Sequence, residues 1–300
     1  MIARRESSST RAPWPGRVPC GQAVKLLAIA VCCAAVTAGA DTVKEPEFLT
    51  GYKDDAKARS IAKSLFDSLG HVSTTGTDEV MDGGYRGKIH LVPQLPKGKY
   101  RQQLVWVASA LTAIDAFFAD FKDTPKYRWQ KLELRFVRSV GKRTPSAYAT
   151  GWSITHNVVG SLLTSERGVR ETYVHELFHL NDFDHGDWSS KTLATDYAAI
   201  VKKCGTTGAK AVKCLAPYAP NDTKVRASGT YYAFQPDNGD SVHEYAAELA
   251  VRYFKEQTEM RTSGSLSQAA FKCGPTENAR AWKSLVDEFF AGRDLVPACE

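Results

Sequence analysis

This sequence lacks a large excess of charge of either sign. Its formal net charge is +6 over 300 residues. Residues 1–40 hold five of the 39 basic residues but only one of the 33 acidic ones, so a net charge of +2 remains without them. Proteins that neutralise many phosphates concentrate Lys and Arg on one surface. The composition therefore gives no indication of nucleic acid binding, and we expect no nucleic acid among the partners.

Cysteine is also scarce, and its spacing excludes one class of metal site. None of the seven cysteines forms a Cys-x-x-Cys pair, the arrangement typical of cysteine-rich zinc sites. Four cysteines follow residue 40, and an even number in an exported chain suggests two disulfides. Three pairings are possible. We expect the most local one, which joins Cys204 to Cys214 and Cys273 to Cys299.

The N-terminal segment lacks an apolar run long enough to cross a bilayer. Its run Leu26–Val36 is too short, follows several basic residues and precedes the small residues Ala38-Gly39-Ala40. This pattern predicts a signal peptide at residues 1–40, and hence a secreted or periplasmic protein with no membrane association after cleavage. Retention of the segment as a membrane anchor is the alternative.

Beyond residue 40, stretches with helical spacing of apolar residues alternate with strand-like ones. Leu132, Leu134 and Phe136, for example, alternate with charged residues as in a half-buried strand. This order predicts an α+β fold, with a mostly helical N-terminal region at 41–125 and a second domain at 126–300. We expect helices at 54–69, 100–121, 170–181, 191–203, 241–254 and 275–290, and strands at 89–92, 132–136, 147–154 and 158–163. The rest of 71–99, and most of 204–240, should be irregular.

The strongest motif is His175-Glu176-x-x-His179. On a helix, residues four apart lie on one face, so both imidazoles can bind one metal ion, with Zn–N bonds of ~2.1 Å. Glu176 lies about 100° further round the helix, where it can reach a water molecule on the metal but not the metal itself. Two histidine ligands with one general base are typical of zinc hydrolases. The motif predicts one Zn²⁺ per chain.

This motif needs a third protein ligand, and three residues are candidates. Glu244 lies on a largely apolar helix, and Glu248, one turn further on, can orient a histidine by a hydrogen bond. His185 has the spacing of a metzincin ligand, but Asp182 occupies the position where glycine lets the chain turn back. The third candidate is Asp196. We favour Glu244, and we interpret Asp182 as a residue that supports the site or ends the helix.

Several of these residues resemble a known family. The motif from His175 to Asp182, the pair Tyr231-Tyr232 and the segment Glu244-Tyr-Ala-Ala-Glu248 are similar to the catalytic domain of anthrax lethal factor and the Pro-Pro endopeptidases. The resemblance covers about residues 130–256. It implies a gluzincin-like zinc peptidase domain at 126–300.

The resemblance also implies a fold and two assignments. The implied fold is zincin-like: a small mixed sheet packed on an active-site helix and a second ligand-bearing helix, with additional N-terminal helices. In that family the first glutamate is the third zinc ligand and a preceding tyrosine stabilises the oxyanion, which points to Glu244 and to Tyr232 (or Tyr231). Asp196, in Ala194-Thr195-Asp196-Tyr197, resembles more weakly the aspartate ligand of deuterolysin and the peptidyl-Lys metalloendopeptidases.

We therefore expect a secreted zinc metalloendopeptidase that acts on a protein or peptide, with Glu176 as general base and Tyr232 as oxyanion stabiliser. The alternative is a zinc-containing toxin-like or binding module with a narrow protein target or no protease activity. A third possibility is hydrolysis of another amide, such as a cell-wall peptide. The presence of Glu176 favours an enzyme.

Overall fold

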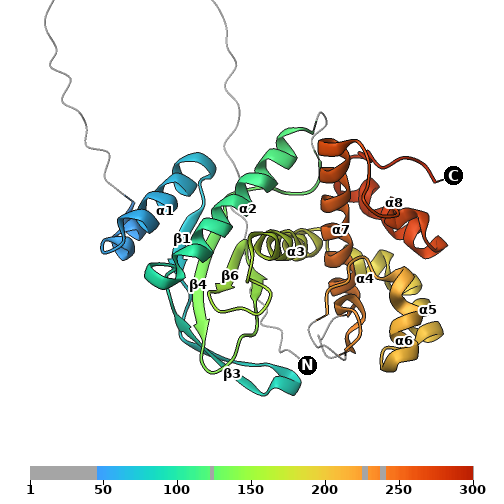
Figure 1. Cartoon of the computed structure of the whole chain (residues 1–300), viewed down its shortest axis with the longest axis horizontal. Coiled ribbons are helices and arrows are strands. Elements are labelled where there is room, and N and C mark those ends of the chain that lie inside the picture. Colours follow the sequence, from blue (N-terminus) through green and yellow to red (C-terminus); the bar gives the residue numbers. More distant parts are fainter. Residues whose placement is uncertain (1–45, 122–124, 225–228, 237–240, 300) are drawn as a thin grey trace, which may run out of the picture. The chain divides into compact units, whose positions relative to one another are not determined.

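A mixed β-sheet and a set of helices make up the fold (Figure 1). The computed structural model describes residues 46–121, 125–224, 229–236 and 241–299, and the signal peptide expected at residues 1–40 lies outside them. The predicted α+β class is confirmed.

The helices are α1 (Ala56–Leu69), α2 (Arg101–Ala119), α3 (Glu166–Asp184), α4 (Trp188–Thr192), α5 (Ala194–Cys204), α6 (Gly208–Leu215), α7 (Ser241–Ser263) and α8 (Thr276–Phe289). The strands are β1 (Val72–Thr75), β2 (Glu79–Asp82), β3 (Lys88–Pro93), β4 (Glu133–Ser139), β5 (Ala147–Thr150) and β6 (Ser153–Asn157).

The sheet has the strand order β2-β3-β4-β6-β5. β4 is parallel to β6 and to β1, which pairs with the first half of β4, whereas β3 pairs antiparallel with its second half. β5 pairs antiparallel with β6 and stands at the end of the order. Its outer edge therefore meets no other strand among the described residues, and α3 packs beside it.

Strands β5 and β6 form a tight hairpin that the sequence did not predict. Only Gly151 and Trp152 separate the paired residues, and both have positive φ angles, 55° and 58°. A type I′ turn requires this backbone at both central positions and matches the twist of the strands. The single strand expected at 147–154 is therefore wrong. The strand expected at 158–163 is also wrong, because the chain makes turns there before α3 begins.

The extent of β4 and part of residues 71–99 were also predicted wrongly. β4 continues past Phe136 because Val137 is buried on a small second cluster with Ile89 and Leu91. These partners lie on β3, which confirms the strand expected at 89–92, whereas β1 and β2 lie in a stretch that was expected to be irregular. A strand that is buried on both faces loses the alternation that reveals it in a sequence.

Helices α2, α3 and α7 pack together and contribute to the main hydrophobic core. The described helix Gly98–Ala119, which includes α2, is long and apolar enough to cross a membrane. Leu104, Leu111 and Ile114 of this helix are fully buried in the core, so packing accounts for its apolar face. Because α2 belongs to the N-terminal region and α3 to the second domain expected from the sequence, the two regions share this core.

The loop expected at residues 204–240 contains more helix than its composition indicated, namely α6 and two short 3-10 turns. The disulfide Cys204–Cys214 joins the end of α5 to α6, and Cys273–Cys299 attaches the C-terminal segment to the residues before α8. The predicted pairing is confirmed. Two disulfides are consistent with an oxidising, extracellular environment.

Candidate metal centre

Helix α3 carries the His-Glu-x-x-His motif and starts one turn earlier than expected. Ser165 caps it, because its Oγ accepts a hydrogen bond from the Gly168 N–H at 3.1 Å. Leu177 is fully buried in the core and fixes the rotation of the helix. His175 and His179, four residues apart, consequently lie on one face and approach α7.

Helix α7 supplies the acidic partners. Glu244 lies in its first turn, where the helix dipole favours a negative charge. Residues 245–254 are all buried, which excludes a solvated acidic face for this part of the helix. Glu248 itself is only 5% exposed. The packing of α7 on α3 brings Glu244 and Glu248 against the two histidines.

The two histidines and Glu244 converge on one point. The Nε2 atom of His175 lies 3.0 Å from Nε2 of His179 and 3.0 Å from Oε2 of Glu244. The Nε2 atom of His179 lies 3.7 Å from the same oxygen. All three atoms lie within 4.8 Å of one another, so these residues could hold a metal ion.

The spacing of these atoms suits a tetrahedrally bound ion. Ligands that are ~2.1 Å from a tetrahedral metal ion lie about 3.4 Å from each other. The three observed separations, from 3.0 to 3.7 Å, lie on both sides of that value. Three ligands would leave one of four positions open, as in catalytic rather than structural metal sites.

Glu248 supports the site from behind His175. Its Oε1 atom lies 3.3 Å from Nδ1 of His175, the ring nitrogen that faces away from the metal-binding point. Its buried Oε2 atom has no hydrogen-bond partner among the residues that the structure describes. A carboxylate in this position fixes the orientation of a ligating imidazole and raises its basicity. This contact is the one expected of Glu248.

Asp182 has a different set of contacts. Its carboxylate accepts hydrogen bonds from the Ser189 N–H at 2.8 Å and from the Ser189 hydroxyl at 2.5 Å. It also lies 3.5 Å from Nε2 of His243, the neighbour of Glu244. Asp182 thus connects α3, α4 and the first turn of α7, and supports the site through His243 rather than through either histidine of the motif.

Glu176 lies beside the metal-binding point on the side of β5. It is 8% exposed and accepts a hydrogen bond from the backbone of Ala149, on the outer edge of that strand. Burial raises the pKa of Glu176, and the repulsion from Glu244 acts in the same direction, although both histidines oppose it. A carboxyl group with a raised pKa in a water-accessible cleft suits proton transfer near neutral pH.

The structure distinguishes between the two adjacent tyrosines. The ring of Tyr232 lies 5.7 Å from the ring of His175, and its hydroxyl is hydrogen-bonded to Glu244. Burial and the neighbouring carboxylates raise the pKa of Tyr232, so the hydroxyl keeps its proton and can donate it in a hydrogen bond. Tyr231 instead packs under Lys224, with the ammonium nitrogen 4.7 Å from its ring centre. Tyr232 is the tyrosine at the site.

His175 and Glu244 each change the pKa of the other. Burial disfavours charge on His175, but hydrogen bonds with Glu244 and Glu248 outweigh it and raise the His175 pKa. Burial also disfavours charge on Glu244, yet hydrogen bonds with His175 and His179 hold the pKa of its carboxyl well below the ordinary range. Glu244 is therefore a carboxylate, the form in which it can bind a cation.

The two other candidate ligands have partners elsewhere. His185 approaches Glu288 of α8, with 2.9 Å between Nδ1 and Oε1. Asp196 forms an ion pair with Arg280, with separations of 2.7 and 2.9 Å. Neither joins the group of His175, His179 and Glu244, which is the set that the sequence analysis favoured.

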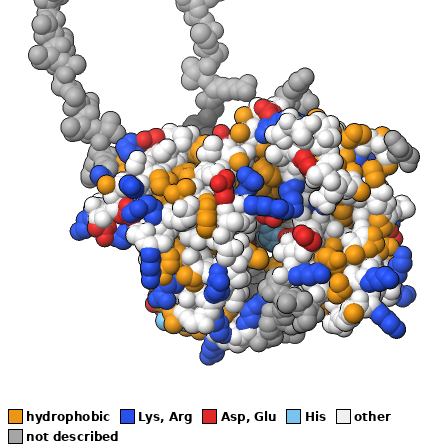
Figure 2. Space-filling view, in the orientation of Figure 1, with side chains coloured by type: hydrophobic (Ala, Val, Ile, Leu, Met, Phe, Trp, Pro, Cys, Tyr) orange, Lys and Arg blue, Asp and Glu red, His pale blue; other side chains and the backbone are white. Residues whose placement is uncertain are grey.

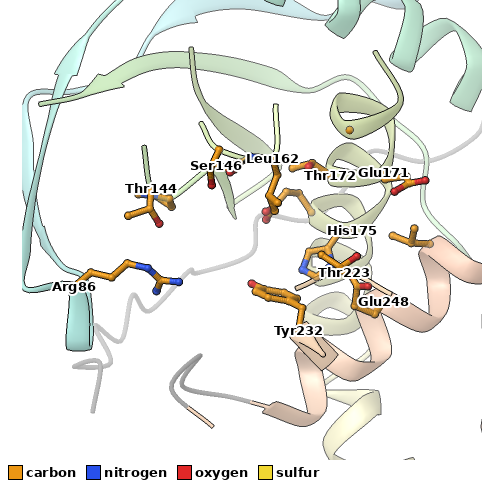
Figure 3. Close-up of a pocket in the computed structure, with 16 residues that line it drawn as sticks. Arg86, Thr144, Ser146, Leu162, Glu171, Thr172, His175, Thr223, Tyr232 and Glu248 are labelled. Atoms are coloured by element: carbon orange, nitrogen blue, oxygen red, sulfur yellow. Dashed lines mark hydrogen bonds and ion pairs between the residues drawn. The ribbon is translucent and has the colours of Figure 1, made fainter. Parts of the chain in front are cut away.

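Two hollows flank the metal-binding group along α3 and β5. The first, of ≈ 220 Å³, is lined by Thr172, His175 and Glu176 of α3, by the start of β5 and by Tyr232. Figure 3 shows His175 and Tyr232 directed into it and Arg86 on the opposite wall. We call it the N-terminal hollow because it adjoins the first half of α3.

The second, the C-terminal hollow of ≈ 410 Å³, is lined by His179, Leu180 and Phe183 of α3 and by residues 149–152 of the hairpin. Four polar side chains complete its wall, those of Asp182, Asp184, Asp187 and His243. Histidine surface (pale blue) is visible in a hollow near the middle of the face shown in Figure 2. Apart from the predicted site residues, the side chains that line the two hollows, Trp152 and Phe183 among them, were not predicted from the sequence. The spacing of Phe183, four after His179, was the one available signal.

Comparisons with known proteins give no assignment. No model of a protein family matches this chain, and neither a curated protein nor a solved structure matches it significantly.

Proposed function

We propose that this protein is an exported, zinc-dependent metalloendopeptidase with a zincin-like active site. The observation that carries the proposal is the convergence of His175, His179 and Glu244 on one point, with Glu176 and Tyr232 beside it. Two imidazoles and one carboxylate with an open fourth position are the ligand set of several zinc peptidases. The disulfides and the basic, apolar leader support export.

Each residue has a role in amide hydrolysis. Zinc supplies Lewis-acid chemistry when bound by such residues, since it polarises a carbonyl group and makes water more acidic. Glu176 accepts a proton from the attacking water and delivers it to the departing amine nitrogen. Tyr232 donates a hydrogen bond to the substrate oxygen that gains negative charge. Glu248 keeps His175 in the orientation and tautomer that ligation requires.

The edge of β5 supports a peptide as the substrate. An extended chain can add to a free sheet edge through main-chain hydrogen bonds. Ala149 on this edge contacts Glu176, so a peptide bound there passes the general base. A hollow on each side of the site leaves room for substrate residues before and after the scissile bond, which suits cleavage within a chain.

The proposal is tested with the purified chain and its Glu176→Gln variant. We expect both to bind zinc equally, and only the wild type to cleave a peptide library. Zinc binding without cleavage by the wild type would leave a binding module with a narrow target as the better account. Full proteolysis by Glu176→Gln would refute the mechanism.

A further inference from the structure

The face of α3 that carries His175 and His179 also carries an aromatic side chain, Phe183. His175, His179 and Phe183 are spaced four residues apart and therefore follow one another along one face of the helix. Phe183 is 75% exposed, the highest value among the large hydrophobic residues exposed in the described part of the chain. A large apolar side chain next to a metal-binding histidine suggests contact with a ligand.

A second aromatic residue on the same hollow, Trp152, has an unfavourable backbone conformation. Trp152 has a φ of 58°, in the left-handed region that bulky residues rarely adopt and that glycine would occupy without strain. Strained residues of this kind gather at functional sites.

Three contacts fix the position of this tryptophan. Its indole Nε1 donates a hydrogen bond to Asp184 at 3.2 Å. Arg128 lies over its ring at 4.5 Å and pairs with the same carboxylate at 2.7 Å. Both Trp152 and Phe183 line the C-terminal hollow, in which Leu180 is a further apolar side chain. The hollow of ≈ 410 Å³ is within the size range of small-ligand pockets, roughly 300–1,000 Å³.

The direction of a bound peptide follows from β5. This strand runs from the N-terminal hollow, lined by Ala147, to the C-terminal hollow, lined by Ala149 and Thr150. A peptide that adds to its edge in the antiparallel sense, the more stable pairing, runs in the opposite direction. Residues before the scissile bond then lie in the C-terminal hollow, and residues after it lie in the N-terminal hollow.

We propose that Trp152, Phe183 and Leu180 form a specificity subsite for an aromatic or large aliphatic side chain on the N-terminal side of the scissile bond. This inference rests on the proposed peptidase function and extends it to a substrate class. Apolar side chains enter such a pocket because contact with Phe183 and Leu180 removes surface of both partners from water. Ring–ring contacts with Trp152 and Phe183 favour aromatic side chains further.

The test compares pairs of peptides that differ only by Phe or Ala at the preferred position, which a peptide library identifies first. For the wild type we expect kcat/KM to be about tenfold higher for the Phe peptide. Phe183→Ser and Trp152→Gly should each reduce this ratio towards one, and glycine fits the positive φ of residue 152. Val80→Ser, which changes another exposed apolar residue (61%) on β2, is the matched control and should keep the ratio.

A second readout separates this inference from the peptidase proposal. Fluorescence anisotropy measures binding of the labelled Phe and Ala peptides to the Glu176→Gln variant. Selective binding by this variant, together with no cleavage of either peptide by the wild type, would support the subsite and overturn the peptidase function. Cleavage and binding with equal preference for both peptides would overturn the subsite alone. If Phe183→Ser changes sedimentation of the protein but not its peptide selectivity, the face binds a second copy of the chain and the subsite is refuted.

Discussion

Replacement of Glu248 by Gln isolates the contribution of the residue behind His175. The variant keeps the shape of the side chain but removes the negative charge 3.3 Å from Nδ1 of that histidine. Loss of such a partner typically weakens metal binding by about 10- to 100-fold. A tenfold loss is about 1.4 kcal/mol of binding free energy.

The same change also removes a hydrogen-bond partner of His175 in the metal-free protein. Comparison of unfolding with and without zinc therefore separates this loss from the loss of metal binding. The stabilisation by zinc should fall by about 1.4 kcal/mol for each tenfold loss of affinity. For a domain of this size that lowers the zinc-induced rise in Tm by about 3–5 °C.

Two assays measure these effects: competition with a chelator gives the zinc affinity, and thermal unfolding with and without zinc gives the shift in Tm. Glu259→Gln is the matched control, because Glu259 lies on the same helix and its carboxylate instead accepts a hydrogen bond from the Ser267 N–H at 2.7 Å. Unchanged zinc affinity in Glu248→Gln, or an equal loss in Glu259→Gln, would refute this role of Glu248.

Three further predictions concern stability and are checked by urea unfolding. Burial lowers the pKa of His71 to about 4, so the unfolded chain binds more protons than the folded one between pH ~6.5 and ~4. The free energy of unfolding should therefore fall as the pH falls through that window. His71→Asn should make it depend less on pH, and an unchanged pH dependence would contradict the reasoning. Asp55→Ala removes the N-cap of α1 and the charged hydrogen bonds from Arg101 and should cost about 3 kcal/mol, whereas a loss below about 1 kcal/mol would show that these contacts are weak. Replacement of both Cys273 and Cys299 by Ser opens a loop with a sequence separation of 26 and should lower the free energy of unfolding by about 3.5 kcal/mol. An unchanged free energy of unfolding would contradict this prediction and indicate that the unfolded chain is already compact.

Local patterns in the sequence predicted the parts of the molecule that depend on a single element. The motif at His175 requires only a helix, and apolar periodicity predicted α2 and α8 close to their observed limits. It also predicted α3 and α7, but α3 begins four residues earlier than expected and α7 ends nine residues later. The buried character of Tyr245 and its neighbours also indicated that Glu244 faces protein rather than solvent. The choice of Glu244 therefore followed from the sequence.

Features that depend on packing between distant segments were not predicted. Val137 is buried because β3 lies beside it, and no local pattern of β4 reveals that neighbour. The hairpin turn was not predicted because Trp152 is not a residue typical of a turn with positive φ. Contacts with Arg128 and Asp184, which lie on other parts of the chain, stabilise it there. The sequence favoured Glu244 but kept His185 as an alternative ligand, because the contact of His185 with Glu288 of α8 depends on packing between distant segments.

The central claim is that His175, His179 and Glu244 together bind one zinc ion. The most direct test is the zinc content of the purified chain and of three single variants, Glu244→Ala, His185→Ala and Asp196→Ala. We predict about one zinc per chain in the wild type and in the last two variants, and loss of zinc in Glu244→Ala. Retention of zinc by Glu244→Ala, or its loss only from His185→Ala or Asp196→Ala, would contradict the account.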